Sequence, residues 1–147
     1  MKIYFASDHA GFEMKNALKE YVAGLEYGVE DCGAYELDPD DDYTLFVKRA
    51  AEAVSKDPEN VKAIVLGGSG QGEDMVADKF PGVRSAEYYG GNLEIVRLSR
   101  EHNDANVLSL GARFISLEEA KEAVKIWLET PFGNEERHVR RISEIEN

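Results

Sequence analysis

Cysteine, cationic residues and long hydrophobic runs are all scarce in this sequence of 147 residues. The single cysteine, Cys32, cannot form an internal disulfide and gives no metal cluster by itself, which suits a reducing cytoplasm. The apolar run at the start ends at Asp8, so it is too short for a signal peptide, and no other segment approaches the length of a membrane span. We therefore expect a cytoplasmic, metal-free protein that does not enter membranes.

The shortage of cations limits the partners that the chain can bind. With 29 acidic and 17 basic residues the formal net charge is −12, so the overall field repels nucleic acid and anionic membranes. A small anionic substrate is still compatible with this charge if cations gather at one point. The densest group of cations is Arg137, Arg140 and Arg141, near the end of the chain.

Short apolar segments alternate with amphipathic ones along the chain, and no repeat or linker divides it. Parallel strands need crossover helices, so this alternation predicts one α/β domain, residues 1–147, with a five-stranded parallel sheet covered on both faces. Pro131 should end the last core helix, and residues 132–147 should form a polar C-terminal helical extension. The expected strands are 2–6, 29–32, 63–66, 83–88 and 106–110, and the expected helices are 12–25, 45–55, one opening near 73, 93–101, 116–128 and 134–145.

Polar and glycine-rich segments follow the first, third and fifth predicted strands. In open α/β sheets the ligand binds beyond the carboxyl ends of the strands, so these segments are the candidate site. The run from Gly67 to Glu73 lacks the lysine of a P-loop, and Glu73 replaces the third glycine of a dinucleotide fingerprint. Its amides could bind an anion, or the run could be a tight turn in which Glu73 complements the helix dipole. The residues alone leave both interpretations open.

The other polar clusters have structural interpretations as well. Asp8 could cap a helix, and His102 could complement the carbonyl end of one. Arg137 and Arg141 are four residues apart and share a helix face, where they could clamp a phosphate or form ion pairs with neighbouring glutamates.

Five groups of residues stand in a fixed order along nearly the whole chain. They are Ser7-Asp8-His9-Ala10-Gly11-Phe12, Gly68-Ser69-Gly70-x-Gly72, Lys79-x-Pro81-Gly82-x-Arg84, Arg100 to Leu108 with Gly111-Ala112-Arg113, and Arg137-His138-x-x-Arg141. Together they closely resemble the ribose-5-phosphate isomerase B family and its galactose-6-phosphate isomerase relatives. The resemblance implies a Rossmann-like αβα sandwich, a homodimer or dimer of dimers with shared active sites, and cofactor-free isomerisation of a phosphorylated small sugar through a cis-enediolate.

The same resemblance implies a role for each matching residue. One branch of the family has a cysteine base just before the glycine loop, but Gly67 stands there in this chain, so Glu73 is implied as the base. Ser69 and the amides of Gly70, Gln71 and Gly72 would form an oxyanion cradle beside Gly68, and His102 would assist ring opening. Asp8 and Asn103 would contact sugar oxygens, Tyr43 would line the pocket, and the phosphate would be held by His9, Arg113, Arg137 and Arg141.

Isomerisation needs a base, donors for the developing negative charge and a distant clamp, and these residues supply all three. The expected substrate is ribose 5-phosphate, with a tetrose or a hexose phosphate of the allose or galactose 6-phosphate type as alternatives. A non-catalytic nucleotide- or sugar-phosphate-binding domain is the remaining hypothesis, in which Glu87 would bind a ribose hydroxyl. A helix N-terminus would lower the pKa of Glu73 and burial would raise it, and the sequence does not decide between them.

Overall fold

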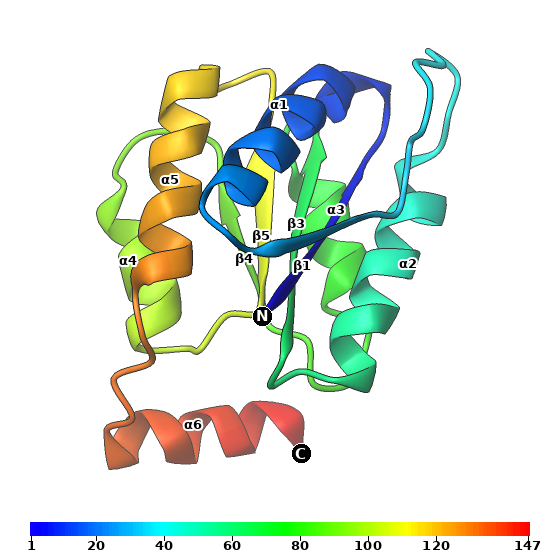
Figure 1. Ribbon diagram of the computed structural model, residues 1–147. Coiled ribbons are helices and arrows are strands. Elements are labelled where there is room, and N and C mark those ends of the chain that lie inside the picture. Colours follow the sequence, from blue (N-terminus) through cyan, green and yellow to red (C-terminus); the bar gives the residue numbers. More distant parts are fainter.

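The computed structural model describes residues Met1 to Asn147 and contains one five-stranded sheet in which all neighbouring strands are parallel (Figure 1). The strand order is β2-β1-β3-β5-β4. The predicted α/β class with a five-stranded parallel sheet is therefore confirmed. The strands are β1 (Lys2–Ser7), β2 (Gly28–Asp31), β3 (Val61–Gly67), β4 (Ser85–Tyr88) and β5 (Val107–Gly111).

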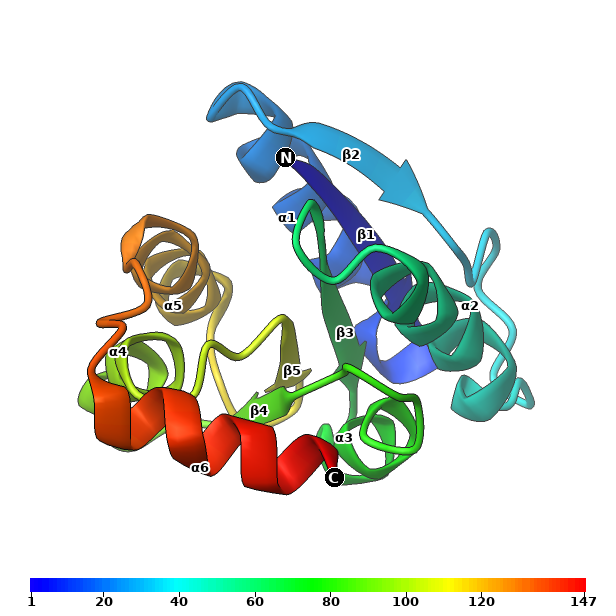
Figure 2. The same ribbon diagram turned by 90° about the horizontal axis from the view of Figure 1, so that it is seen from below.

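Helices cover both faces of the sheet, as Figure 2 shows most clearly. Helices α1, α4 and α5 lie on one face and α2 and α3 on the other, while α6 crosses below the sheet (Figures 1 and 2). None of these helices is long and apolar enough to span a bilayer. Their bounds are η1 (His9–Gly11, a 3-10 turn), α1 (Phe12–Gly24), α2 (Tyr43–Lys56), α3 (Gln71–Ala77), α4 (Glu94–Glu101), α5 (Leu117–Glu129) and α6 (Glu136–Glu146).

The expected boundaries differ from the observed ones by at most two residues, and β4 is one of the elements with a two-residue difference. This strand was expected from Val83 but begins at Ser85. The amide of Val83 donates to the carbonyl of Phe80, and the amide of Arg84 donates to Oδ1 of Asn106 at 2.8 Å. Both donors are thus used in a turn. The ladder with β5 starts only after them.

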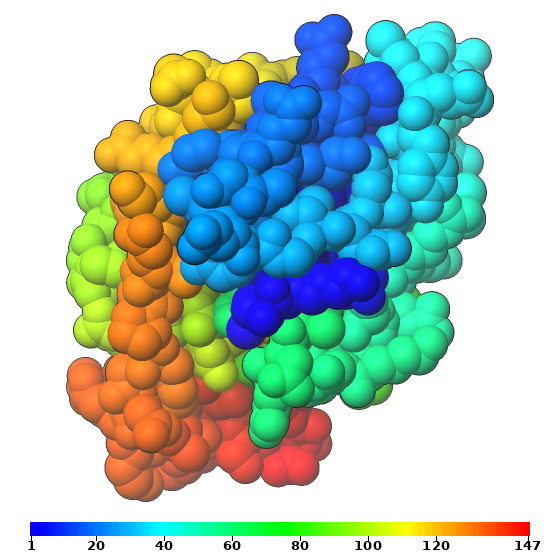
Figure 3. Space-filling view, viewed as in Figure 1, coloured from blue at the N-terminus to red at the C-terminus, as the bar shows by residue number.

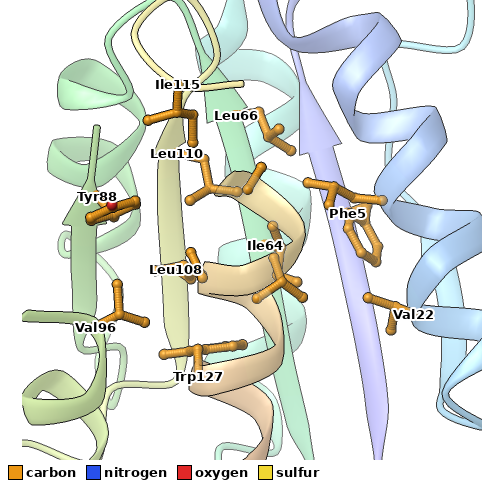
Figure 4. Packing of buried hydrophobic residues seen from close by; sticks show 14 of the residues in the cluster. Phe5, Val22, Ile64, Leu66, Tyr88, Val96, Leu108, Leu110, Ile115 and Trp127 are labelled. Atoms are coloured by element: carbon orange, nitrogen blue, oxygen red, sulfur yellow. The ribbon is translucent and has the colours of Figure 1, made fainter. Parts of the chain in front are cut away.

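Two hydrophobic clusters fill the spaces between sheet and helices. The larger one joins the sheet to α1, α4 and α5, and Figure 4 shows Phe5, Ile64 and Leu108 facing Val22 and the fully buried Trp127 across it. The smaller cluster joins the other face of the sheet to α2 and α3 and contains mainly alanine and valine, among them Ala50, Val54 and Val65. Small side chains there allow α2 and α3 to approach the strands closely.

Lys15 is a charged residue that the apolar spacing of α1 did not identify as buried. Its side chain is fully buried, with Nζ 2.8 Å from Oδ1 of Asp31 and also bound to the carbonyl of Ala34 at 2.5 Å. Burial lowers the pKa of Lys15, while the ion pair with Asp31 opposes that shift. A buried cation requires such compensation, so Lys15 ties α1 to the end of β2 and to the segment after it.

The chain leaves the neighbouring strands β1 and β3 on opposite sides of the sheet. After β1 it enters α1 on one face, and after β3 it enters α3 on the other. Ser7 is opposite Leu66, and Gly67 is opposite Gly111, so the segments after β1, β3 and β5 begin at nearly the same level. Such a switch in direction opens a crevice at the carboxyl edge of a sheet.

Gly11 brings η1 against β3 and provides a test of this packing. A Cβ atom at Gly11 would lie 2.6 Å from Cβ of Leu66 and 3.0 Å from its carbonyl carbon. We expect Gly11→Ala to lower the free energy of unfolding by about 1–3 kcal/mol, because backbone and core atoms must move. Urea unfolding measures this change. Gly24→Ala is the control: nothing lies within 4 Å of its Cβ position, so the free energy should be unchanged or raised by up to about 1 kcal/mol.

Candidate active site

Most of the predicted site residues gather at the carboxyl edge of the sheet. Asp8 and His9 follow β1, the glycine loop and the first turn of α3 follow β3, and Arg113 follows β5. Tyr43 opens α2 and contacts the loop from the side. The residues that the fold brings to this edge are Asp8, His9, Tyr43, Gly68, Ser69, Gly70, Gln71, Gly72, Glu73 and Arg113.

The carboxyl group of Glu73 lies directly against the backbone of Gly67, the last residue of β3. A Cβ atom at Gly67 would lie 1.8 Å from Oε1 and 2.5 Å from Oε2 of Glu73. The carboxyl group thus occupies the volume that a side chain at position 67 would fill. Only 4% of Glu73 is exposed.

This enclosure changes the pKa of Glu73. Burial raises its pKa, the negative charge of Asp8 raises it further, and a hydrogen bond from the backbone amide of Glu73 itself opposes the rise. The two opposing effects considered from the sequence are both present, and burial outweighs the backbone. A carboxylate with a raised pKa is a stronger base than an ordinary glutamate, which is the property that proton abstraction from carbon requires.

The glycine loop is fixed by contacts on both sides. Gly70 has a φ of +81°, and its carbonyl accepts a hydrogen bond from Oγ of Ser109 at 2.6 Å. Oγ of Ser69 accepts from the amide of Gln71 at 3.2 Å. A Cβ atom at Gly72 would lie 2.4 Å from the hydroxyl oxygen of Tyr43, so this position also has no room for a side chain. These contacts hold the backbone of the loop in place beside Glu73.

The side chains of Arg113 and His9 stand at the same edge. The guanidinium group of Arg113 lies over Gly68 and forms no hydrogen bond or ion pair. His9 is bound to Asp41, and the acidic and imidazole atoms of Asp8, His9 and Asp41 lie within 4.8 Å of one another. Because Nδ1 of His9 and Oδ1 of Asp41 already bond each other, we assign these side chains to an ion pair. The expectation of a metal-free site stays a prediction.

The remaining predicted residues lie at the opposite edge of the sheet. His102 and Asn103 follow α4 and precede β5, whereas Arg137 and Arg141 are on α6, which crosses the amino edge (Figure 1). Arg113 follows the same strand β5, whose five residues separate the two edges by roughly 15 Å. A single chain therefore does not bring these four residues to Glu73. In Figure 3 α6 is at the lower edge, and the acidic loop that contains Asp41 is at the upper right.

At the amino edge the imidazole rings of His102 and His138 stack, with their centroids 4.3 Å apart and an angle of 15° between the planes. Burial lowers the pKa of His138, and the neighbouring His102 and Arg137 lower it further. A neutral His138 can lie against His102 without charge repulsion. It therefore supports the ring that is expected to assist sugar ring opening.

Arg84 connects the three segments that form this amino-edge cluster. Its Nε donates to the carbonyl of Asn103 and its Nη2 to that of Asp104, both at 3.0 Å, while its Nη1 is 2.8 Å from Oε1 of Glu146. Only 15% of the side chain is exposed. Asp104 has a φ of +47°, an uncommon conformation for a residue other than glycine, and the bond from Arg84 helps to hold it.

The arginines of α6 differ in their partners. Arg140 pairs with Glu136 and Glu144. Arg137 pairs with Glu135, as the alternative interpretation of ion pairs with neighbouring glutamates predicts for it. Arg141 forms no hydrogen bond or ion pair through its guanidinium group. In a chain with a net charge of −12, the unpaired Arg113 and Arg141 are therefore free to bind an anion.

Sequence reasoning did not identify Asp41, Arg84 or His138 as functional residues. Arg84 and His138 belong to motifs of the family resemblance, which implies no role for them, and Asp41 lies in the acidic run 38–42 between a predicted strand and a predicted helix. Their partners are between 19 and 62 residues away in the sequence. For Asp41, the one local signal of a role in the site is its position two residues before Tyr43, which is itself a predicted site residue.

Comparisons with known proteins agree with this arrangement. The family model described as ribose/galactose isomerase matches residues 3–145. The chain belongs to this family. It is 41% identical over 142 residues to ribose-5-phosphate isomerase B of Mycolicibacterium paratuberculosis, an alignment that covers 97% of this chain and 87% of the relative.

Solved structures of relatives have the same fold. Ribose-5-phosphate isomerase B of Mycoplasma genitalium, with bound ribulose 5-phosphate, is 34% identical, with a TM-score of 0.94 and coverage of 99% of this chain and 93% of that one. The enzyme of Thermotoga maritima is 38% identical, with a TM-score of 0.90 and coverage of 99% and 97%. The resemblance seen in the motifs and the Rossmann-like architecture are thereby confirmed. The role of each site residue stays a prediction.

The contact between Gly67 and Glu73 predicts an unusual pattern of mutant effects. Gly67→Ala should lower kcat at least about 100-fold, because the new methyl group displaces the carboxyl group that is predicted to act as base. Glu73→Ala should cause a loss at least as large. The double variant should be no less active than Glu73→Ala, because no carboxyl group is left to displace. Steady-state kinetics of the three variants test this, and losses that multiply would contradict it.

Proposed function

We propose that this protein interconverts ribose 5-phosphate and ribulose 5-phosphate. Glu73 removes the proton from C2 of the open-chain aldose to give a cis-enediolate and returns it to C1. In the enediolate the proton of the C2 hydroxyl passes to the C1 oxygen, so that the C1 carbonyl becomes a hydroxyl and the C2 hydroxyl becomes a carbonyl. Protonation at C2 reverses the reaction. The chemistry needs one base and no change in net oxidation state of the sugar.

The observation that carries this proposal is the burial of Glu73 with a raised pKa beside a backbone loop. The base is largely shielded from water, which limits its reprotonation by solvent. Ser69 and the amides of Gly70 to Gly72 are the donors for the oxygen on which negative charge develops. The loop backbone that carries them is held before substrate binds, and the amide of Gln71 must exchange its bond to Oγ of Ser69 for one to the substrate.

The other residues have binding and ring-opening roles in this proposal. Asp8 and Asn103 contact sugar oxygens, Tyr43 lines the site beside Gly72, and His102 transfers a proton when the furanose ring opens. The phosphate is held by His9, Arg113, Arg137 and Arg141. Binding energy from this distant group positions the reacting carbons against Glu73.

We further propose that each site is shared between two subunits of a homodimer. Three features support this: the predicted residues occupy opposite edges of the sheet, Arg141 has no partner in its own chain, and Glu73 lines none of the five cavities of the single chain. The amino-edge cluster of a second copy would supply the missing wall and the additional cations. A dimer of dimers would preserve the same pairing.

A panel of aldose and ketose phosphates with four to six carbons tests the substrate. We expect the largest kcat/KM for ribose 5-phosphate, with less activity towards tetrose and hexose phosphates. A hexose 6-phosphate of the allose or galactose type as the best substrate would contradict the pentose assignment but keep the reaction class. Thermal stabilisation by NAD and by no sugar phosphate would contradict the isomerase itself.

Complementation between inactive chains tests the shared site. Glu73→Gln and Arg141→Ala homodimers should each lose at least about 99% of activity at subsaturating substrate, because one lacks the base and the other part of the clamp. After subunit exchange, half the dimers are mixed, and one of the two sites in each mixed dimer is intact. About a quarter of wild-type activity should therefore return.

Glu73→Gln mixed with Glu73→Ala is the control, and it should recover nothing because no dimer contains the base. Verified subunit exchange without recovery in the first mixture would mean that Glu73 and Arg141 serve the same chain's site, or that Arg141 does not contribute to it.

A further inference from the structure

Asp41 binds His9 through two hydrogen bonds to a single oxygen. Oδ1 of Asp41 accepts from the backbone amide of His9 at 3.0 Å and lies 2.8 Å from Nδ1 of its ring. The loop that carries Asp41 is closed locally, since the amide of Asp41 donates to the carbonyl of Asp38. One carboxylate oxygen thus fixes the positions of both the backbone and the ring of His9.

The exposure of the two side chains shows which end of the pair a ligand can reach. The side chain of Asp41 is 6% exposed and that of His9 is 29% exposed. With Nδ1 directed to Asp41, the remaining nitrogen, Nε2, is on the other side of the ring. The carboxylate is therefore a buried support, and the ring is the part of the pair that faces outwards.

The charge of Asp41 has no other cation to compensate it. His9 is its only ion-pair partner, and its second oxygen, Oδ2, is buried and accepts no hydrogen bond. A buried carboxylate is strongly unfavourable unless it is paired, so the arrangement favours a protonated imidazole. In that form Nδ1–H donates to Asp41 and Nε2–H is available to an anion.

Charged groups from three elements act on the His9 ring. The hydrogen bond that His9 donates to Asp41, in the loop before α2, is the largest influence and raises the pKa of His9. Burial opposes this rise, Asp8 after β1 adds to it, and Arg113 after β5 lowers the pKa. The net effect is a raised pKa. A group of this kind keeps its proton to a higher pH than an ordinary histidine, into the range where a phosphate monoester is a dianion.

We propose that Asp41 is a positioning residue that holds the His9 imidazolium by its Nδ1–H and thereby presents Nε2–H to the phosphate group of the substrate. This inference rests on the proposed function, in which His9 binds that phosphate. It assigns Asp41 a specific task that does not involve contact with the substrate.

Asp41→Asn tests the inference because asparagine keeps the shape and removes the charge. NMR titration of the imidazole nitrogens can follow His9 directly, since the chain has only three histidines. We expect the pKa of His9 to fall in the variant. Inorganic phosphate at about pH 8 should bind about threefold to tenfold more weakly than to the wild type, and the two proteins should converge near pH 5.5, where both rings are protonated.

Asp40→Asn is the matched control, because it removes one negative charge from the same loop at an exposed residue that does not contact His9. It should leave both the pKa of His9 and the affinity for phosphate close to wild type. In kinetics, Asp41→Asn should raise KM for the sugar phosphate at about pH 8 with little change in kcat, because Glu73 and its surroundings are untouched.

A double variant separates a loss that acts through His9 from a loss caused by misfolding. If Asp41 acts through His9, Asp41→Asn should weaken phosphate binding no further in a His9→Gln background. An unchanged pKa of His9, equal weakening at both pH values, or additive losses in the double variant would each overturn the inference. Failure of the proposed function would instead appear as wild-type protein inactive on every sugar phosphate, and the NMR titration with inorganic phosphate would still decide the role of Asp41.

Discussion

The length of the parallel strands is the constraint on which the organisation of this molecule depends. Side chains that follow β1, β3 and β5 are concentrated at one edge of the sheet, and those that precede β5 or belong to α6 are at the other. Strands of this length are too long for side chains to bridge the two edges. In the proposed function, one chain thus carries two half-sites that face away from each other, and a symmetric pair of chains would join them.

Each half-site is held by a different kind of interaction. At the carboxyl edge, close backbone approaches dominate: glycines 67, 70 and 72 leave no room for side chains, so Glu73 and Tyr43 have well-defined positions. At the amino edge, hydrogen bonds dominate, because Arg84 binds the turn at Asn103 and also the end of α6. The excess of acidic residues gives most cations a partner. Arg113 and Arg141, which have neither a hydrogen bond nor an ion pair through their guanidinium groups, are two of the residues that the proposed function assigns to the phosphate.

The sequence predicted the fold well because its signals are local. Apolar segments alternating with amphipathic ones identified every strand and helix to within a few residues, and the ordered motifs identified the family. The environment of Glu73 was not predictable in the same way. Whether burial or the backbone controls its pKa depends on how closely β3 and α3 pack, which no local pattern reports. Asp41, Arg84 and the buried Lys15 were missed because their partners are distant in sequence and their residue types are normally exposed.

The contact between Gly67 and Glu73 also limits how such enzymes can have diverged. The family resemblance includes a branch with a cysteine base at the position of Gly67, and here that position and the carboxyl group of Glu73 compete for one volume. An ancestor could not have carried both bases in these places and then lost one. An exchange of one base for the other in this backbone therefore involves both position 67 and position 73. A cysteine base at position 67 and a glutamate base at position 73 would thus exclude each other sterically, whatever the chemistry of either.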